Sequence, residues 1–366
     1  MYMRVPMYKF FAVFIILLPG FVVAAEVSLV LDNYRYPRKT PVVSIVGKIV
    51  EGDLVKVENV AKEIILKKGS KFLHVYLNSS GGDANEAMKI GRLLRKLLAK
   101  TYAVGFTYYD PKSQHGLETA QYYANNPEQL QRTPNNIKFI PLGEKVPEEY
   151  IRRCYSACVL IFYAGVRKDA SNNGYFRDSS NIIPVIGLHR PYFDKNYYSE
   201  LSPIEANSKY KDLEKSIATY LSEMGAPDEI IERMLKTPSN DIELVDHREF
   251  ENLYERKEPF FDEWLLAKCG EMSNGKAILN DEDYAYIEKI RREKMSEARR
   301  VGDGSEAYTS AMLSMFVHVE GSFFPKGSDL ERYKRLLNIV RQHNLRIRDC
   351  QDGSVQLHQI QWALSH

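Results

Sequence analysis

The sequence predicts an α/β fold for the central part of the chain, followed by a mainly helical C-terminal region. Short apolar stretches that end at glycine or polar corners alternate with stretches whose apolar residues recur at helical spacing. Hydrophobic residues make up 44% of the 366 residues, which is enough for a large buried core. Lys and Arg number 50 against 48 Asp and Glu. The chain therefore lacks the basic surface of a nucleic-acid-binding protein, and we expect no nucleic-acid partner.

The N-terminal segment predicts export. Arg4 and Lys9 precede an uncharged apolar run over residues 10–23, and small residues then form an acceptable cleavage site. This run is shorter than the ~20 apolar residues that a spanning helix usually needs. We therefore expect residues 1–25 to be a cleaved signal peptide and the mature protein to be periplasmic or secreted. The alternative is an uncleaved signal anchor that faces the periplasm, which would be the chain's one contact with a membrane.

Two strand–helix units open the predicted domain, which covers residues 40–255. An apolar run over 42–50 predicts a buried strand, and apolar residues at helical spacing over 54–65 predict the helix that follows. Glycine at position 69 ends this helix, and the next strand is predicted over 72–78. This alternation is typical of a mostly parallel sheet.

The second strand runs into a Ser-Ser-Gly-Gly corner at 79–82. Asp83 and Glu86 then predict a capping box at the start of a helix whose apolar face extends over 87–97. Glycine lets the backbone turn tightly and leave amide N–H groups facing outward, beside the positive end of the helix dipole. Such a corner suits an anion or a developing oxyanion, although a plain turn would have the same residues.

Two regions depart from this alternation. Residues 106–150 are rich in Tyr, Asn, Gln and Pro, and they predict an insertion that serves as a lid or a specificity loop. Residues 256–366 predict a helical C-terminal region, with a charged helix over 281–300 and a further helix near 330–343. We find no chemistry in this region, and expect it to cover the core or to mediate assembly, for example of a homo-oligomer.

The stretch RRCYSACVLIFYAG, residues 152–165, sets Ser156 at the start of an apolar helix. A serine there is by itself an ordinary N-cap. Some thirty residues later a strand over 183–188 ends at His189, and Pro191 prevents the strand from continuing. A hydroxyl, a histidine at a strand end and glycine amides are the groups that acyl transfer needs, because serine requires a base and its tetrahedral oxyanion requires N–H donors.

Four segments together resemble the Clp protease proteolytic subunit and its relatives in the Clp/crotonase superfamily, especially exported bacterial members with a Cys-x-Ser-Ala-Cys motif. They are YLNSSGG at 76–82, SACVLIFYAG at 156–165, GLHRP at 187–191 and TPSNDIELV at 237–245. The resemblance covers roughly residues 40–255. It implies a repeated ββα superhelical core, into which the 106–150 segment is inserted.

The resemblance also implies the roles of individual residues. Ser156 corresponds to the nucleophile, His189 to the general base and Asp241 to the acid that orients the base. The N–H groups of Gly82 and Ala157 correspond to the oxyanion hole.

Three aspartates are candidates for the acid. Asp241 begins the short Ile-Glu-Leu-Val strand, where the family carries its acid, and we prefer it for this reason. Asp246 and Asp228 are its rivals.

Four cysteines in an exported chain suggest two disulfides, and four cysteines allow three pairings. Cys154 and Cys158 lie four residues apart with no histidine pair nearby, so we expect a disulfide here and no zinc. A bridge at this place would fix the backbone around Ser156. Cys269 and Cys350 would then form the second bridge, in the C-terminal region.

The sequence thus predicts an exported serine peptidase-like hydrolase that uses a Ser-His-Asp triad on peptide or protein substrates. The alternative is a non-catalytic binding or assembly protein of the same fold, because Ser80 replaces the family's proline and the insertion is large. An acyl-CoA enzyme of the crotonase type is disfavoured, since coenzyme A is cytoplasmic. The sequence contains no nucleotide-binding loop, and we expect neither a cofactor nor a metal.

Overall fold

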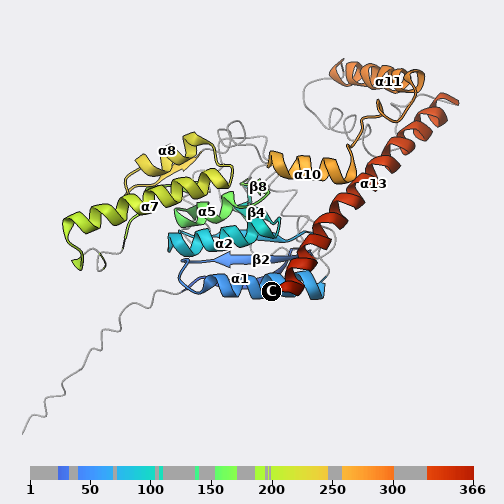
Figure 1. The fold of residues 1–366 in the computed structure, drawn as a ribbon. Coiled ribbons are helices and arrows are strands. Elements are labelled where there is room, and N and C mark those ends of the chain that lie inside the picture. The colour runs from blue at the N-terminus through green and yellow to red at the C-terminus, as the bar shows by residue number, and fades with distance from the viewer. Residues whose placement is uncertain are drawn as a thin grey trace, which may run out of the picture.

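A computed structural model shows a mixed α/β fold (Figure 1), as the sequence predicts. The predicted signal peptide up to residue 23 and most of the predicted insertion lie outside the residues that the structure describes. The described residues are 24–32, 40–68, 72–103, 107–109, 137–139, 153–170, 186–193, 197, 199–245, 258–300 and 328–366.

The main sheet has five strands in the order β1-β2-β3-β4-β8. β1 runs antiparallel to β2, and the other neighbours are parallel. Val75 in β3 lies opposite Val43 in β2 and Thr101 in β4, and all three are buried. The strands are β1 (Glu26–Asp32), β2 (Thr40–Val46), β3 (His74–Asn78), β4 (Lys100–Ala103) and β8 (Arg167–Asp169).

A smaller sheet in the order β10-β9-β7 carries the predicted catalytic segments. The Ser79 N–H, just beyond β3, donates to the Arg153 carbonyl (2.7 Å), and the Tyr155 N–H donates to the Ser79 carbonyl (3.0 Å). These two bonds join β7 to the end of β3. The strands are β7 (Cys154–Tyr155), β9 (Ile186–Leu188) and β10 (Glu243–Val245). Within the predicted insertion, β5 (Thr107–Tyr109) pairs with β6 (Ile137–Phe139) in parallel.

Helices pack on the main sheet, and a second layer covers them (Figure 1). Tyr220 in the outer helix α7 donates its hydroxyl to the Leu160 carbonyl in α5 (2.9 Å). Gly91 in α2 leaves room for this tyrosine, because a Cβ there would overlap the Tyr220 hydroxyl. The helices are α1 (Asp53–Glu63) with its π-helical extension η1 (Ile64–Lys68), α2 (Ala84–Lys96), α5 (Ala157–Tyr163), α7 (Pro203–Glu223) and α8 (Asp228–Lys236).

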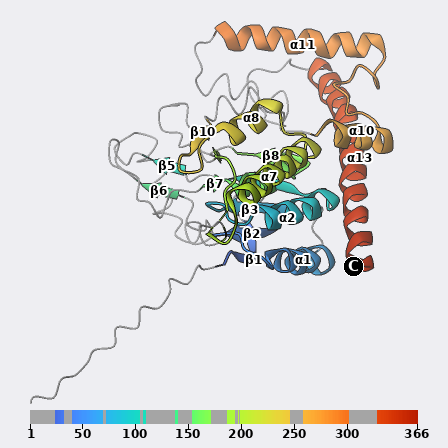
Figure 2. The same cartoon turned by 60° about the vertical axis from the view of Figure 1, so that its left-hand side comes forward.

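The described part of the C-terminal region is helical, as predicted, and forms an arm on the core (Figure 2). One half of α13 packs on the core, where the Gln359 side-chain amide donates to the Leu97 carbonyl (2.7 Å). The other half packs against α11 in a separate apolar cluster that includes Ile287 and Tyr333. The helices are α10 (Pro259–Cys269), α11 (Asp281–Arg300) and α13 (Ser328–Ser365).

Helix α13 is much longer than the helix predicted near 330–343, so that predicted end is wrong. The helix continues through Gly353, which costs about 1 kcal/mol relative to alanine in a helix interior. Val355, Gln359 and Ala363 recur at helical spacing and are all buried against the core. Their burial offsets the cost of the glycine, and it depends on a partner surface that the local sequence does not contain.

The predicted capping box of α2 is half present. Asp83 caps the helix by accepting the Glu86 N–H (2.9 Å), as predicted. The Glu86 carboxylate turns instead to the start of α1, where it accepts the N–H groups of Gly52 (3.0 Å) and Leu54 (2.8 Å). Glu86 therefore links two helix N-termini, a contact between segments more than thirty residues apart.

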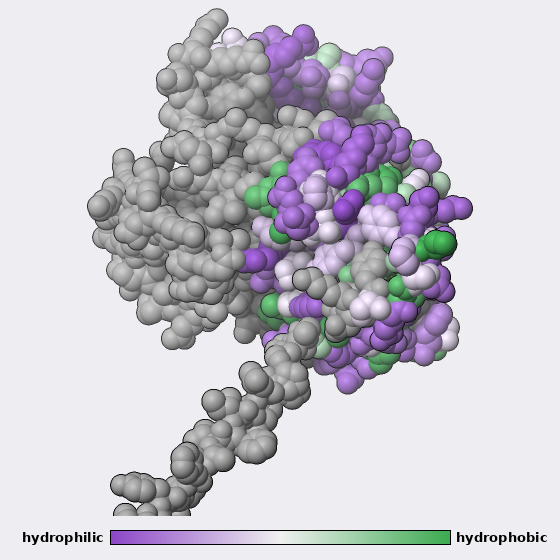
Figure 3. Space-filling view, turned by 90° about the vertical axis from the view of Figure 1, so that its left-hand side faces the viewer, coloured by the Kyte–Doolittle hydropathy of each residue, from purple (hydrophilic) through white to green (hydrophobic). Residues whose placement is uncertain are grey.

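No helix among the described residues is both long and apolar enough to cross a membrane. The face of the molecule shown in Figure 3 is mainly hydrophilic where residues are described, with small and separate hydrophobic areas.

Candidate active site

Ser156 lies at the turn between β7 and α5, at the helix start where the sequence places it. It occupies the N-cap position of α5, but its side chain makes no capping hydrogen bond. The serine hydroxyl therefore does not serve as a helix cap, which would be the simplest structural role for it.

The backbone of Ser156 is strained. Its φ is 57° and its ψ is −124°, a conformation that costs a residue with a side chain about 1–3 kcal/mol. Hydrogen bonds hold it on both sides: the Ser156 N–H donates to the Gly187 carbonyl (3.0 Å), and its carbonyl accepts the Val159 N–H (2.9 Å). A serine on a sharp, strained strand-to-helix turn has the geometry of a nucleophile elbow.

A disulfide spans this turn. Cys154 and Cys158 are bonded, with their Cα atoms 5.1 Å apart, and neither residue is exposed. The second bridge joins Cys269 at the end of α10 to Cys350 in α13. Both predicted pairings are confirmed, and the first one closes a covalent ring around Ser156.

The glycine corner after β3 lies directly against Ser156. A Cβ on Gly81 would be 2.7 Å from Ser156 Cβ and 3.1 Å from its Oγ, and a Cβ on Gly82 would overlap the Ile49 carbonyl oxygen. Both glycines also have positive φ, 103° and 140°. Side chains at either position would disrupt the corner, so the backbone approaches the serine hydroxyl as closely as it does only because both residues are glycine.

The amide of Gly82 is held in a fixed direction. The Gly81 carbonyl accepts the Ile49 N–H (2.9 Å) and the Ser79 hydroxyl (3.2 Å). Because the peptide bond is planar and trans, the Gly82 N–H points the opposite way from that carbonyl. Among the described residues it has no acceptor, and neither has the Ala157 N–H. The two donors predicted for the oxyanion hole are therefore unpaired in this part of the chain.

Ser79 is a site residue that the sequence reasoning missed. Its buried hydroxyl also accepts the Gly81 N–H (3.1 Å), so it fixes the corner from within. A serine two residues before a glycine is the signal that could have identified it, since serine hydroxyls bond backbone groups two residues on.

Glu86 supports the same corner from the first turn of α2. Burial raises the pKa of its carboxyl, but the N–H groups of Leu54 and Gly52 and the Lys89 ammonium together hold that pKa below its ordinary value. The carboxylate is therefore charged at neutral pH and fixes the helix that follows the glycines to the start of α1.

His189 follows β9, which is the neighbour of β7. Tyr155 pairs with Gly187 in parallel register, so Ser156 and His189 lie at the carboxyl ends of adjacent strands. The ring is almost buried, and its Nδ1 lies 2.9 Å from the Arg190 carbonyl oxygen. In the described structure no hydrogen bond joins Ser156 Oγ to His189. Catalytic hydrogen bonds are often loose without substrate, and the Ser–His pair stays a prediction.

Asp241 is exposed, and its Oδ1 accepts the N–H of Ile242 (2.8 Å). Of its two rivals, Asp228 begins α8, and Asp246 lies outside the described residues. No carboxylate among the described residues forms a hydrogen bond or an ion pair with His189. The assignment of the acid to Asp241 therefore stays a prediction.

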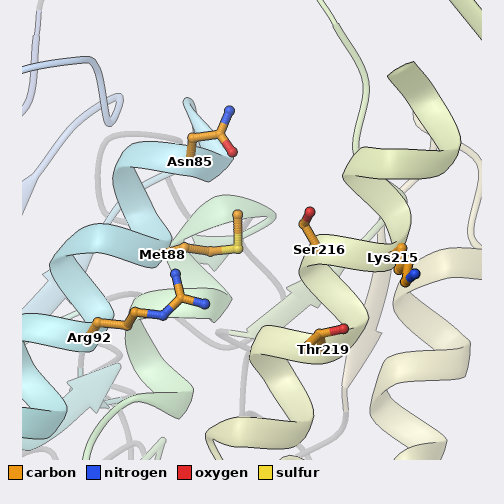
Figure 4. A pocket seen from close by; sticks show the side chains of 6 residues that line it. All are labelled: Asn85, Met88, Arg92, Lys215, Ser216 and Thr219. Carbon is orange, nitrogen blue, oxygen red and sulfur yellow. The ribbon is translucent and has the colours of Figure 1, made fainter. Parts of the chain in front are cut away.

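A groove of about 380 Å³ lies between α2 and α7 (Figure 4). None of the predicted site residues lines it, and the fixed amides and the strained serine lie elsewhere. We therefore place the candidate site at Ser156. The groove is lined by Asn85, Met88, Arg92, Lys215, Ser216 and Thr219.

No protein-family model matches this chain, and a search of curated proteins also found no match.

Proposed function

We propose that this protein is a serine hydrolase that acts on peptide or other amide substrates, with Ser156 as its nucleophile. The observation that carries the proposal is the strained conformation of Ser156, whose hydroxyl caps no helix. Strained backbone persists where the surrounding structure fixes it, and it concentrates at functional sites. Here two hydrogen bonds and a disulfide fix it.

The proposed reaction follows from the groups around Ser156. His189 takes the proton of the Ser156 hydroxyl as the oxygen attacks the substrate carbonyl, and the N–H groups of Gly82 and Ala157 stabilise the resulting oxyanion. The protonated imidazole then gives its proton to the leaving amine, which leaves an acyl group on the serine. Water, activated by the same histidine, hydrolyses this ester. The Ser–His hydrogen bond would form by side-chain movement when substrate binds.

We further propose a Clp/crotonase-type core and an exported location. The parallel strands, the glycine corner and the serine turn occur in the order that the resemblance implies. Two disulfides fit an oxidising compartment, since thiols in the cytosol are usually kept reduced.

The proposal is tested by a fluorophosphonate probe, which reacts with activated serines. We expect the purified protein to be labelled, labelling to be lost in Ser156→Ala, and labelling to be unchanged in Ser216→Ala. Ser216 is a suitable control because it lies in α7, on the groove away from the site, and its hydroxyl donates to the Asp212 carbonyl.

The absence of a Ser156–His189 hydrogen bond favours one alternative, a binding or assembly protein that has the fold without the activity. A folded protein that several fluorophosphonates fail to label, and whose behaviour Ser156→Ala does not change, would support this alternative and overturn the hydrolase.

A further inference from the structure

The contact of His189 with its own chain determines which ring nitrogen carries the proton. Nδ1 lies 2.9 Å from the Arg190 carbonyl oxygen, and a carbonyl oxygen can only accept a hydrogen bond. Nδ1 must therefore be the protonated nitrogen. A neutral imidazole has a single N–H, so Nε2 keeps its lone pair and is the atom that can act as a base.

We propose that the main-chain carbonyl of Arg190, and not Asp241, orients His189 as the general base. In a catalytic triad the acid holds one tautomer of the histidine and fixes the orientation of its ring. The Arg190 carbonyl does both here, and its dipole also favours the imidazolium that forms during catalysis. The inference rests on the proposed function, because it assigns how the base of that same site is positioned.

The Arg190 carbonyl belongs to a segment that is itself held in place. The Arg190 N–H donates to the Thr237 carbonyl (2.9 Å), and Thr237 is almost buried. The Thr237 hydroxyl lies 2.8 Å from Glu243 Oε2 and 2.7 Å from the Arg233 carbonyl. Glu243 Oε1 in turn accepts from Arg233 Nε (2.7 Å). Thr237, Arg233 and Glu243 thus form a polar clamp that fixes the end of α8 and β10 to the histidine segment.

Among the described residues, the two carboxylates of the segment that pairs with β9 have other partners. Both oxygens of Glu243 are bonded within the clamp, and Asp241 accepts the N–H of its neighbour Ile242 in an exposed position. The clamp, which reaches His189 through the backbone, takes the place of a direct contact from Asp241. Thr237 is therefore a positioning residue.

The tautomer of His189 is measured directly by NMR. In protein labelled with ¹⁵N in its 8 histidines, long-range ¹H–¹⁵N spectra distinguish a protonated from an unprotonated ring nitrogen, and His189→Gln assigns the signal. We expect His189 in its neutral form to carry the proton on Nδ1. A proton on Nε2 would overturn the proposal, and this measurement does not depend on whether the protein is a hydrolase.

Labelling rates separate the carbonyl from the carboxylate. Replacing an essential triad acid by its amide lowers the rate by about 10⁴-fold, which is the loss that the sequence-based assignment of Asp241 predicts. The inference competes with that assignment, and under the inference Asp241→Asn should label within about twofold of wild type. Thr237→Val should lower the rate by about tenfold or more, because the clamp loses its hydroxyl, and Thr237→Ser should restore it. A folded Asp241→Asn variant that no longer labels would refute the inference while leaving Ser156 as the nucleophile. Wild-type protein that does not label would instead refute the hydrolase.

Discussion

The two disulfides lie in two regions that are stabilised in different ways. Cys154 and Cys158 are four residues apart, buried, and placed on either side of the strained Ser156. Cys269 and Cys350 are 81 residues apart and tie α10 to α13, at the base of the C-terminal arm. The chain-entropy model gives about 2 kcal/mol for a loop as short as the first and about 4–5 kcal/mol for one as long as the second.

This difference shows that one kind of bond serves two purposes. The long bridge removes much of the freedom of the unfolded chain, so its main effect is on stability. The short bridge removes little of that freedom, and it fixes a local geometry that the backbone alone would not favour. Removing the long bridge should therefore mainly lower stability, and removing the short bridge should mainly lower the labelling of Ser156.

The largest expected effect is on the stability of the arm. Replacing both Cys269 and Cys350 with alanine should lower the free energy of unfolding by up to about 4–5 kcal/mol, because the unfolded chain regains its loop entropy. Denaturant unfolding followed by circular dichroism measures the change. Fluorophosphonate labelling below the transition should stay at the wild-type rate, since the bridge is remote in sequence from the serine turn. A matching loss of labelling in the folded variant would show that the arm also shapes the site.

Removing the short bridge should lower stability less and the labelling of Ser156 more. Replacing Cys154 and Cys158 with alanine should lower the free energy of unfolding by only about 2 kcal/mol. The labelling rate of Ser156 should fall by about tenfold or more, because a nucleophile that is no longer held in place loses its alignment with the base. The labelling rate of the folded variant, measured at several probe concentrations, tests this expectation. Unchanged labelling would mean that the hydrogen bonds to Gly187 and Val159 suffice to hold the turn.

The smallest expected effects are on stability, and they come from replacing two carboxylates, Glu86 beside the glycine corner and Asp283 in the arm. The N–H groups of Leu54 and Gly52 hold the pKa of Glu86 below its usual range despite its burial. A lowered folded-state pKa stabilises the fold above the unfolded value, and this contribution is lost as the pH falls through the folded one. Glu86→Gln should therefore cost about 1–2 kcal/mol at neutral pH, and the difference from wild type should shrink below about pH 4.

Asp283 in the arm is the matched control for Glu86. The Arg332 guanidinium, 2.7 Å away, lowers the pKa of the Asp283 carboxyl, but the pair is accessible to solvent and is screened by salt. Asp283→Asn should follow the same pH trend with a smaller loss, which added salt reduces further. Urea unfolding of both variants between pH 3 and 7 tests this comparison, and an equal loss at high salt would contradict it.

Local signals in the sequence were sufficient for most elements around the site. Apolar periodicity located the strand and helix on each side of the glycine corner, and the charged run over 281–300 coincides with α11. The position of Ser156 at a helix start and both cysteine pairings were also predictable. These features depend on residues that are close in sequence or on a small number of possible pairings.

By itself, then, the sequence determined that a serine, two glycines and a histidine stand at the ends of strands in an α/β chain. The tertiary structure alone decided how they meet. It brought Gly81 against Ser156 and gave that serine its strained φ of 57°. It also turned Glu86 from its own helix to the start of α1, and set the Arg190 carbonyl at His189. Sequence patterns could not fix these contacts. Those of Gly81 and Glu86 depend on how one segment packs against another, and the direction of the Arg190 carbonyl depends on a segment that the distant Thr237 carbonyl holds through the Arg190 N–H.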